Sequence, residues 1–338
     1  MKHVLVIRLS ALGDVAIMKP VVKAYADANP GVRFTVAGPP MLQPLFEGMA
    51  NVSYLGLKKK QSFVKIYKAL DAAGADTVVD LHKVNRVGFA VVLLRLRHLL
   101  DLHYRIFALR KGRVSRWLYL HHWRRAPRRP QWQRYDDVFR RAGLKRAECG
   151  EWRVESVRQL PTTHNPLPTK IGVAPFAQHA GKIWPEERTE ALVRMLSERG
   201  CEVVLFGSKD EAPVLERWAR HYRGVSSMAG RLPFAEELEV IRGLSLMVSM
   251  DSANMHFASA VGVPVVSIWG ATHPDFGFYG FGQDRANALC ADLPCQPCSA
   301  YGSKPCRYGD RRCMAAITPE MVLGKIEAVL KNNIVNTQ

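Results

Sequence analysis

The sequence has no run that approaches the roughly 20 consecutive apolar residues that a membrane-spanning helix needs. Its longest apolar run, Val87–Leu94, is bounded by Arg86 and Arg95. It also has no recognisable export signal, because an apolar strand pattern begins almost directly after Met1 and no small-residue cleavage site follows it. We therefore expect a cytoplasmic protein, or one on the cytoplasmic face of a membrane.

Acidic residues are scarce: 30 Asp and Glu stand against 48 Lys and Arg, a formal net charge of +18. Such an excess predicts an acidic partner, either nucleic acid, an anionic membrane or a phosphorylated substrate. Between Arg95 and Arg134, twelve cations and several aromatic rings accompany a single acid, Asp101. This stretch is either a solvated basic face or a surface for anionic head groups. Its composition also fits a nucleic-acid-binding module.

Tandem repeats and low-complexity tracts are missing as well. The apolar content of 48% predicts a folded protein, and the length of 338 residues is enough for two domains. Strand and helix patterns alternate, which favours parallel sheets with helices on both faces. The expected strands are His3–Arg8, Arg33–Ala37, Val52–Leu55, Thr77–Leu81, Lys170–Ala174, Glu202–Phe206, Leu246–Ser249 and Val263–Trp269. The expected helices are Val15–Ala28, Met41–Glu47, Phe63–Ala73, Val87–Leu99, Gln131–Ala142, Glu186–Glu198, Glu211–His221, Phe234–Arg242 and Pro319–Leu330. The proline-rich segment Leu160–Thr169 predicts a linker between domains at 1–160 and 161–338.

Two consecutive strands near the C-terminus each end in a polar loop. Leu246–Ser249 leads into Asp251-Ser252-Ala253 and a short helix with His256, and the next strand leads into a loop with Thr272. Ligands of open α/β sheets bind at the carboxyl ends of strands, and a helix start there suits a phosphate. The alternative is that Asp251 and Ser252 cap the helix and Thr272 starts a turn.

Two further loops carry candidate site residues. Asp14 follows the first strand, and Ser10 and Gly13 permit a tight turn near a ligand. On spacing alone Asp14 is a helix N-cap, and backbone hydrogen bonds weaken a carboxylate as a base. Lys182, after the first strand of the second domain, is either a phosphate contact or a solvated loop lysine. Arg86 follows the fourth strand, facing a substrate or starting a helix.

Four segments, in this order along the chain, resemble the bacterial heptosyltransferases, the ADP-heptose:lipopolysaccharide transferase family (glycosyltransferase family 9). The matching segments are Ser10-x-x-Gly13-Asp14, Lys182-x-Trp184-Pro185, Asp251-Ser252-Ala253 followed by His256, and Gly270-x-Thr272-x-Pro274. The resemblance covers nearly the whole chain and is weakest between Arg95 and Arg134. Many relatives have Gly at the position of Ala253 and Asp at that of His273.

The resemblance implies a GT-B fold, in which two doubly wound Rossmann-like domains face a cleft. The N-terminal domain would bind the acceptor and the C-terminal domain the nucleotide sugar. The implied reaction is inverting transfer of heptose from ADP-heptose to a hydroxyl of the lipopolysaccharide inner core, without a required cofactor. Asp14 would be the base and Lys182 would contact the donor phosphates. The other implied substrate-binding positions are Ser10, Gly13, Arg86, Asp251, Ser252, Ala253, His256 and Thr272, with His256 packing behind its loop.

The implied partners are ADP-heptose and a lipid-anchored anionic glycan. Peripheral contact with the inner membrane through the stretch from Arg95 to Arg134 would then account for the +18 charge without nucleic acid. A family member that uses another nucleotide sugar, or one that has lost activity, stays open. So does the basic nucleic-acid-binding module, which has no need of Asp14 or the Thr272 loop.

Seven cysteines are present, and four of them are concentrated in one Pro- and Gly-rich segment. Their spacing is Cys295-x2-Cys298-x7-Cys306-x6-Cys313, in which one pair has the spacing of zinc ligands and the second pair is looser. A structural zinc site is therefore one candidate. Disulfides and reduced thiols are the alternatives.

Overall fold

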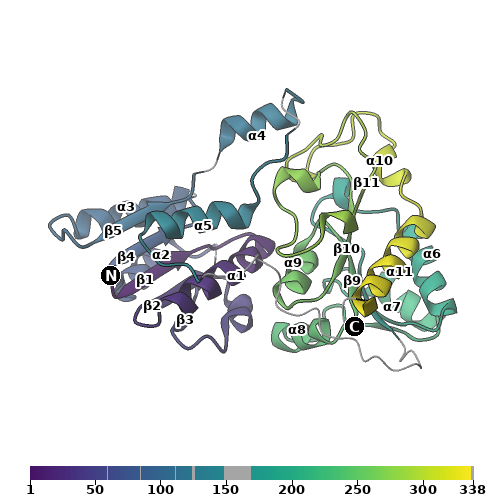
Figure 1. The fold of residues 1–338 in the computed structure, drawn as a ribbon, viewed down its shortest axis with the longest axis horizontal. Helices are drawn as coiled ribbons and strands as arrows, with labels where there is room; N and C mark the ends of the chain where they lie inside the picture. Colours follow the sequence, from purple (N-terminus) through teal and green to yellow (C-terminus); the bar gives the residue numbers. More distant parts are fainter. Residues whose placement is uncertain (59, 84, 111, 124–125, 148–168, 336–338) are drawn as a thin grey trace. The chain divides into compact units, whose positions relative to one another are not determined.

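The computed structural model describes residues 1–338 except 59, 84, 111, 124–125, 148–168 and 336–338. The chain forms two compact units, each with a parallel sheet and helices packed on it (Figure 1). The N-terminal unit comprises Met1–Gly112 and Arg129–Trp152, and the C-terminal unit comprises Arg113–Arg128 and Arg153–Gln338. The predicted linker at Leu160–Thr169 falls almost wholly outside the described residues. Nothing in the sequence pattern predicts that residues 113–128 belong with the C-terminal unit.

The sheet of the N-terminal unit has the order β3-β2-β1-β4-β5, with every neighbouring pair parallel. Its strands are β1 His3–Ile7, β2 Arg33–Gly38, β3 Val52–Gly56, β4 Thr77–Asp80 and β5 Arg105–Ala108. Its helices are α1 Leu12–Ala28, α2 Phe63–Ala72, α3 Asn85–Arg97 and α5 Gln131–Arg141, with a 3-10 helix at Pro40–Phe46.

Apolar side chains hold this unit together on both faces of the sheet. Leu5 and Ile7 of β1 share one core with residues of α2 and α3, including Leu70 and Leu94. Helices α1 and α5 meet through Tyr25 and Phe139, whose rings stack at 4.7 Å. The Tyr25 hydroxyl also donates to Asp136 at 2.8 Å, which satisfies a polar group that would otherwise be buried at a cost.

The sheet of the C-terminal unit has the order β11-β10-β9-β6-β7-β8, again all parallel. Counted from β6, this is the 3-2-1-4-5-6 strand order of dinucleotide-binding folds. The strands are β6 Lys170–Ala174, β7 Glu202–Leu205, β8 Val225–Ser227, β9 Leu246–Met250, β10 Val265–Trp269 and β11 Ala288–Cys290. The helices are α4 Arg113–Leu120, α6 Glu186–Glu198, α7 Ala212–His221, α8 Phe234–Arg242, α9 Ala253–Ala260, α10 Arg312–Ala315 and α11 Pro319–Val335.

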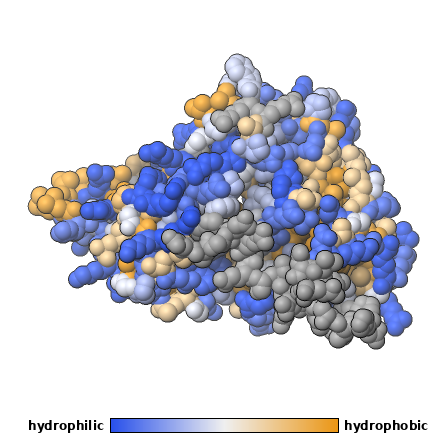
Figure 2. Space-filling view, in the orientation of Figure 1, coloured by the Kyte–Doolittle hydropathy of each residue, from blue (hydrophilic) through white to orange (hydrophobic). Residues whose placement is uncertain are grey.

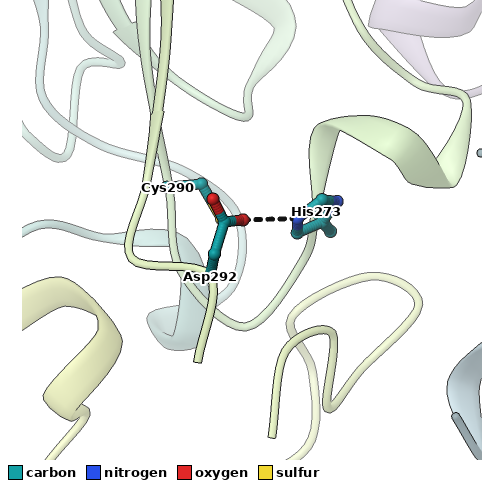
Figure 3. A group of neighbouring side chains, drawn as sticks. All are labelled: His273, Cys290 and Asp292. Atoms are coloured by element: carbon teal, nitrogen blue, oxygen red, sulfur yellow. Dashed lines mark hydrogen bonds and ion pairs between the residues drawn. The ribbon is translucent and has the colours of Figure 1, made fainter. Parts of the chain in front are cut away.

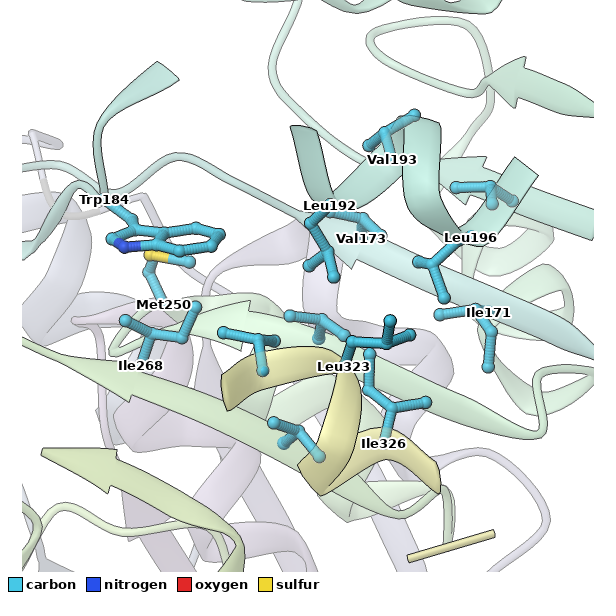
Figure 4. Close-up of a cluster of buried hydrophobic side chains, with 14 of the residues drawn as sticks. Ile171, Val173, Trp184, Leu192, Val193, Leu196, Met250, Ile268, Leu323 and Ile326 are labelled. Atoms are coloured by element: carbon cyan, nitrogen blue, oxygen red, sulfur yellow. The ribbon is translucent and has the colours of Figure 1, made fainter. Parts of the chain in front are cut away.

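A hydrophobic core of this unit lies between the sheet and helices α6, α7 and α11. Trp184 is 1% exposed and lies beside Met250 and Ile268 (Figure 4). Its indole Nε1 donates to the carbonyl oxygen of Ile317 at 3.1 Å. Pro185, the next residue, is the N-cap of α6.

Helix α11 contributes its apolar face to this core. Replacing a large side chain on that face by alanine is therefore expected to destabilise the protein. Ile326 is 1% exposed, and Ile326→Ala is expected to lower the free energy of unfolding by about 2–5 kcal/mol, from lost burial and a residual cavity. The neighbouring Glu327 makes an exposed ion pair with Arg199 at 3.2 Å, so Glu327→Ala is expected to cost less than about 1 kcal/mol. Chemical denaturation of both variants tests this, and equal losses would contradict it.

All eight predicted strands are present, with ends that differ by at most two residues. Three further strands lie outside the eight predicted ranges: β5, β8 and β11. The helix expected at Met41–Glu47 is a 3-10 helix, and α1 begins at Leu12 instead of Val15. Among the described residues, no helix combines the length and the hydrophobicity required to cross a bilayer.

Candidate active site

Each sheet has one point where the strand order reverses, and the predicted site residues collect there. In the N-terminal unit this point lies between β1 and β4, and in the C-terminal unit it lies between β6 and β9. The connections that leave two such strands run in opposite directions, which opens a crevice at their carboxyl ends. Asp14 follows β1, Lys182 follows β6 and Asp251 follows β9, so all three lie at these positions.

Asp14 forms an ion pair with Arg8, the first residue after β1. The side chains are 18% and 12% exposed, respectively. Asp14 Oδ2 also accepts the backbone N–H of Ala11 at 3.3 Å. Ala11, not Asp14, is the N-cap of α1, and Asp14 is the third residue of the helix. The suggestion that Asp14 is the N-cap is therefore wrong, because the helix starts three residues earlier than predicted. Asp14 still supports the helix start through its contact with Ala11.

Arg8 was not predicted as a site residue, although it ends the apolar run of β1. Its guanidinium donates to the carbonyl oxygen of Leu81, beyond β4, at 2.5 Å, and lies 5.9 Å from the centre of the Tyr135 ring. Burial opposes the charge of Arg8, but Tyr135 and Asp14 outweigh it, and the pKa of Arg8 is raised. A permanently charged, nearly buried arginine thus fixes Asp14 against the switch point.

Two buried polar residues complete this edge of the N-terminal sheet. Asp80 ends β4 and accepts the backbone N–H groups of His82 and Lys83, both at 2.8 Å. His82 Nδ1 lies 3.2 Å from the backbone nitrogen of Leu9, which ties the loops after β1 and β4 together. Asp80 and His82 are 2% and 4% exposed. Both residues hold the loops in position. They were not selected from the sequence, although they lie at the end of a predicted strand.

The remaining predicted residues of this unit lie on the same loops. Ser10 is half-buried in the turn between β1 and α1, and Gly13 is buried in the first turn of α1. Arg86 lies in the first turn of α3, at the switch point, and its side chain is outside the described residues.

In the C-terminal unit, Lys182 and Asp251 form an ion pair across the switch point. Lys182 Nζ lies 2.8 Å from Asp251 Oδ2, and the side chains are 16% and 7% exposed. The Thr272 hydroxyl donates to the same oxygen at 2.7 Å. The structure therefore brings together a cation, a carboxylate and a hydroxyl from three different strand ends.

Glycines let these loops approach one another closely. A Cβ at Gly181 would lie 2.8 Å from Cβ of Ala271 and 2.8 Å from the carbonyl oxygen of Gly302. Gly302 has a φ of +77°, in the left-handed region, and packs against the side chain of Lys182. The Ala271 N–H donates to the Gly181 carbonyl at 2.8 Å. The position of Lys182 thus depends on backbone contacts that larger residues would prevent.

Helix α9 starts directly behind the ion pair. Ser252 is its N-cap residue and Ala253 its first residue. The Ser252 hydroxyl lies 3.1 Å from that of Ser249 in β9 and makes no side-chain cap of the helix. The backbone N–H groups and the positive end of the helix dipole remain available to an anion. His256 is 7% exposed, a burial that suits packing behind the loop.

The loop that carries Thr272 is anchored by its neighbour His273. His273 Nε2 lies 2.8 Å from Oδ1 of Asp292, and Cys290 lies beside them (Figure 3). Possible ligand atoms of the three residues all lie within 4.8 Å of one another, close enough for a metal ion. Burial raises the pKa of the Cys290 thiol to about 12. A neutral thiol and a His–Asp hydrogen bond already satisfy this cluster, which holds the loops after β10 and β11 together.

The four clustered cysteines are described and are free thiols, Cys313 buried and the others half-buried. Among the described residues, the group whose ligand atoms meet the 4.8 Å limit is the His273 cluster, which contains none of these four. Zinc at the cysteines thus stays a prediction. Cys298 packs on the site through its backbone, whose N–H donates to the Ala271 carbonyl at 3.1 Å.

The basic, aromatic stretch from Arg95 to Arg134 is divided between the two units. Its central part, α4, packs on the C-terminal unit next to the Thr272 loop. The Tyr119 hydroxyl lies 3.4 Å from His273 Nδ1, and Arg116 donates to the Tyr301 hydroxyl at 2.7 Å. Trp117 and Trp123 are 49% and 77% exposed. The stretch is therefore not one continuous surface of one domain.

Solved structures with the same fold are heptosyltransferases and their relatives. The structure of E. coli ADP-heptose lps heptosyltransferase II has a TM-score of 0.69 and 19% identity, covering 98% of this chain and 99% of that chain. A glycosyl transferase family 9 protein from Veillonella parvula has a TM-score of 0.71 at 19% identity and covers 98% of each chain. E. coli heptosyltransferase WaaC with ADP gives a TM-score of 0.67 at 19% identity, covering 97% of this chain and 99% of that chain. The chain thus has the GT-B fold, with two Rossmann-like units.

Sequence relatives agree with the structural ones. Lipopolysaccharide heptosyltransferase 1 of Pseudomonas aeruginosa is 34% identical over 167 residues, 44% of each chain. Lipooligosaccharide heptosyltransferase 2 of Haemophilus influenzae is 32% identical over 114 residues, 31% of this chain and 32% of that protein. The chain thus aligns with less than half the length of these two relatives. The family model described as glycosyltransferase family 9 (heptosyltransferase) matches residues 63–308. The chain belongs to glycosyltransferase family 9, the heptosyltransferase family.

Proposed function

We propose that this protein is an inverting glycosyltransferase that moves heptose from ADP-heptose to a hydroxyl of the lipopolysaccharide inner core. The observation that carries the proposal is the Lys182–Asp251–Thr272 cluster at the switch point of the C-terminal unit, in a chain of this family. A lysine beside a free helix start forms a site for a diphosphate. The choice of ADP as the nucleotide follows the structural neighbours, one of which is named for ADP-heptose and another of which was solved with ADP.

Asp14 is proposed as the base that takes the proton from the acceptor hydroxyl. Among the described residues, the hydrogen-bond and ion-pair contacts of its carboxylate, with Arg8 and Ala11, both use Oδ2. Oδ1 is then the oxygen that faces the acceptor hydroxyl, while Arg8 holds the carboxylate in one orientation. A base fixed in this way meets the geometric demand of general base catalysis.

Lys182 and the start of α9 are proposed to hold the donor diphosphate and to stabilise the charge of the leaving ADP. Ser252 and Ala253 supply backbone N–H groups, and Thr272 keeps Asp251 oriented. The heptose would be transferred with inversion at its anomeric carbon, because the acceptor oxygen attacks that carbon from the side opposite the leaving ADP. The step breaks the bond from that carbon to the phosphate oxygen, forms one glycosidic bond, and transfers the acceptor proton to Asp14.

We further propose that the protein works at the cytoplasmic face of the inner membrane, where a lipid-anchored acceptor would lie. The charge of +18 supports an anionic partner of this kind. Nucleic acid remains the competing partner for such a charge. Its binding would require neither the Arg8–Asp14 pair nor the Lys182–Asp251 pair.

Release of ADP by the purified protein, given ADP-heptose and a Kdo–lipid A acceptor, tests the proposed reaction. The expected result is release that depends on the acceptor and yields a product of inverted anomeric configuration by NMR. Binding of ADP-heptose without release would point to a different acceptor. Failure to bind ADP-heptose, with tight salt-sensitive binding of RNA or DNA instead, would overturn the proposal.

A further inference from the structure

One face of α3, in the N-terminal unit, presents large apolar side chains to solvent. The exposed fractions are 65% for Phe89, 54% for Val92, 39% for Leu93 and 57% for Leu96. These positions have the i, i+3, i+4, i+7 spacing of a single helical face. The opposite face of the helix is buried in the core of the unit and consists of Val87, Ala90, Val91 and Leu94. A helix that is apolar on both faces is normally covered on both, whereas the second face of α3 is open to solvent in the part of the chain that the structure describes.

The apolar face continues into the turn between α3 and β5. Leu99, Leu100 and Leu102 are 67%, 95% and 91% exposed. Figure 2 shows hydrophobic atoms gathered around this end of the N-terminal unit, with hydrophilic atoms beside them. We call these three leucines and the four exposed residues of α3 the α3 surface. Scattered exposed leucines are ordinary, but a gathered apolar surface marks an interaction site.

Cations accompany this surface. Arg95, Arg97 and Arg105 are exposed, and all lie on α3 or at the start of β5. Two acids are near: Asp71 pairs with Arg97 at 3.0 Å, and Asp101 accepts the backbone N–H of His103 at 2.9 Å. Arginine stems can lie along an apolar layer while their guanidinium groups remain in water. The arrangement matches a bilayer boundary, with an apolar layer below and anionic phosphates above.

We propose that the α3 surface docks the protein on an anionic phospholipid bilayer, with its leucines in the acyl boundary and its arginines among the head groups. Charge complementarity decides between a bilayer and a second copy of the chain. A two-fold dimer through this surface would bring the same cationic patch of both copies together, and like charges oppose such an interface. Phosphate head groups carry the complementary charge. The inference deepens the proposed membrane location by assigning it to a surface.

Co-sedimentation of the full chain with vesicles of equal parts phosphatidylglycerol and phosphatidylcholine tests the proposal. Leu100→Glu/Leu102→Glu is expected to lower the bound fraction roughly tenfold or more, because two nearly fully exposed leucines no longer enter the acyl boundary. Val64→Glu, on α2 of the same unit and 55% exposed, is the matched control and is expected to bind like the wild type. Added salt, or vesicles of phosphatidylcholine alone, is expected to weaken wild-type binding.

Unchanged vesicle binding by the double variant, or an equal loss in the Val64 variant, would overturn the proposal. A wild-type dimer in sedimentation equilibrium that the double variant dissolves, without vesicle binding by either protein, would assign the surface to self-association instead. The vesicle assay contains neither donor nor acceptor. Its failure is therefore distinguishable from a failure of the proposed transfer reaction, which is measured by ADP release.

Discussion

Asp14→Asn is expected to lower the rate of heptose transfer by about a hundredfold to ten-thousandfold, while donor affinity stays nearly constant. Asparagine has the size of aspartate and keeps an oxygen for the N–H of Ala11, but it cannot take a proton from the acceptor. The proposed donor contacts lie in the C-terminal unit, so they are unaffected. Single-turnover rates and equilibrium binding of ADP-heptose measure the two quantities separately.

The contact between Asp14 and Ala11 makes a structural effect the main alternative explanation of such a loss. The variant also loses the charge that pairs with the largely buried Arg8, so a loss of about 1–3 kcal/mol of stability is expected, which thermal unfolding of the variant would reveal. Asp27→Asn is the matched control, because Asp27 lies on the same helix in an exposed pair with Lys23 at 2.7 Å. A folded Asp14 variant that transfers heptose at the wild-type rate would exclude Asp14 as the base.

Lys182→Met is expected to weaken the use of ADP-heptose roughly tenfold to a hundredfold in kcat/KM, since a charge-assisted contact to phosphate is lost. The same change leaves the carboxylate of Asp251 buried with Thr272 as its remaining donor among the contacts described above. We therefore expect an additional loss of about 1–3 kcal/mol in the free energy of unfolding.

A double variant separates these two effects. Lys182→Met/Asp251→Asn removes both charges, so it is expected to recover stability relative to Lys182→Met while donor use stays low. Lys331→Met, an exposed lysine on α11, is the control for a general loss of positive charge. Recovery of donor use together with stability would mean that Lys182 serves the fold and not the phosphates.

The sequence predicts the interior strands of both sheets and the edge strand β3 well, but it predicts the other three edge strands poorly. The three strands outside the predicted ranges, β5, β8 and β11, lie at sheet edges. Each has only three or four residues, mostly half-buried. Interior strands of a parallel sheet are covered on both faces and appear as continuous apolar runs, whereas a short edge strand has no such run.

The loops of the candidate site are predictable from the sequence, but their pairings are not. Lys182 follows β6 and Asp251 follows β9, and these two strands are not consecutive in the sequence. The two side chains meet because the sheet places β6 and β9 side by side at the switch point. A sequence pattern reveals the ends of strands and not their order. Arg8 was overlooked for the same reason, since its contact with Leu81 crosses from β1 to β4. Family resemblance indicated Asp14, whose spacing alone indicates helix capping.

The Lys182–Asp251 pair also bears on how the product leaves. If Lys182 holds the donor diphosphate, as we propose, the arriving phosphate replaces the Asp251 carboxylate as the partner of the Lys182 ammonium group. Asp251 then keeps its hydrogen bond from Thr272. After transfer, the carboxylate reclaims the ammonium group as ADP departs. ADP that rebinds must displace this resident anion. On this proposal, the pair would act as an internal competitor that limits nucleotide affinity and lessens product inhibition when ADP accumulates.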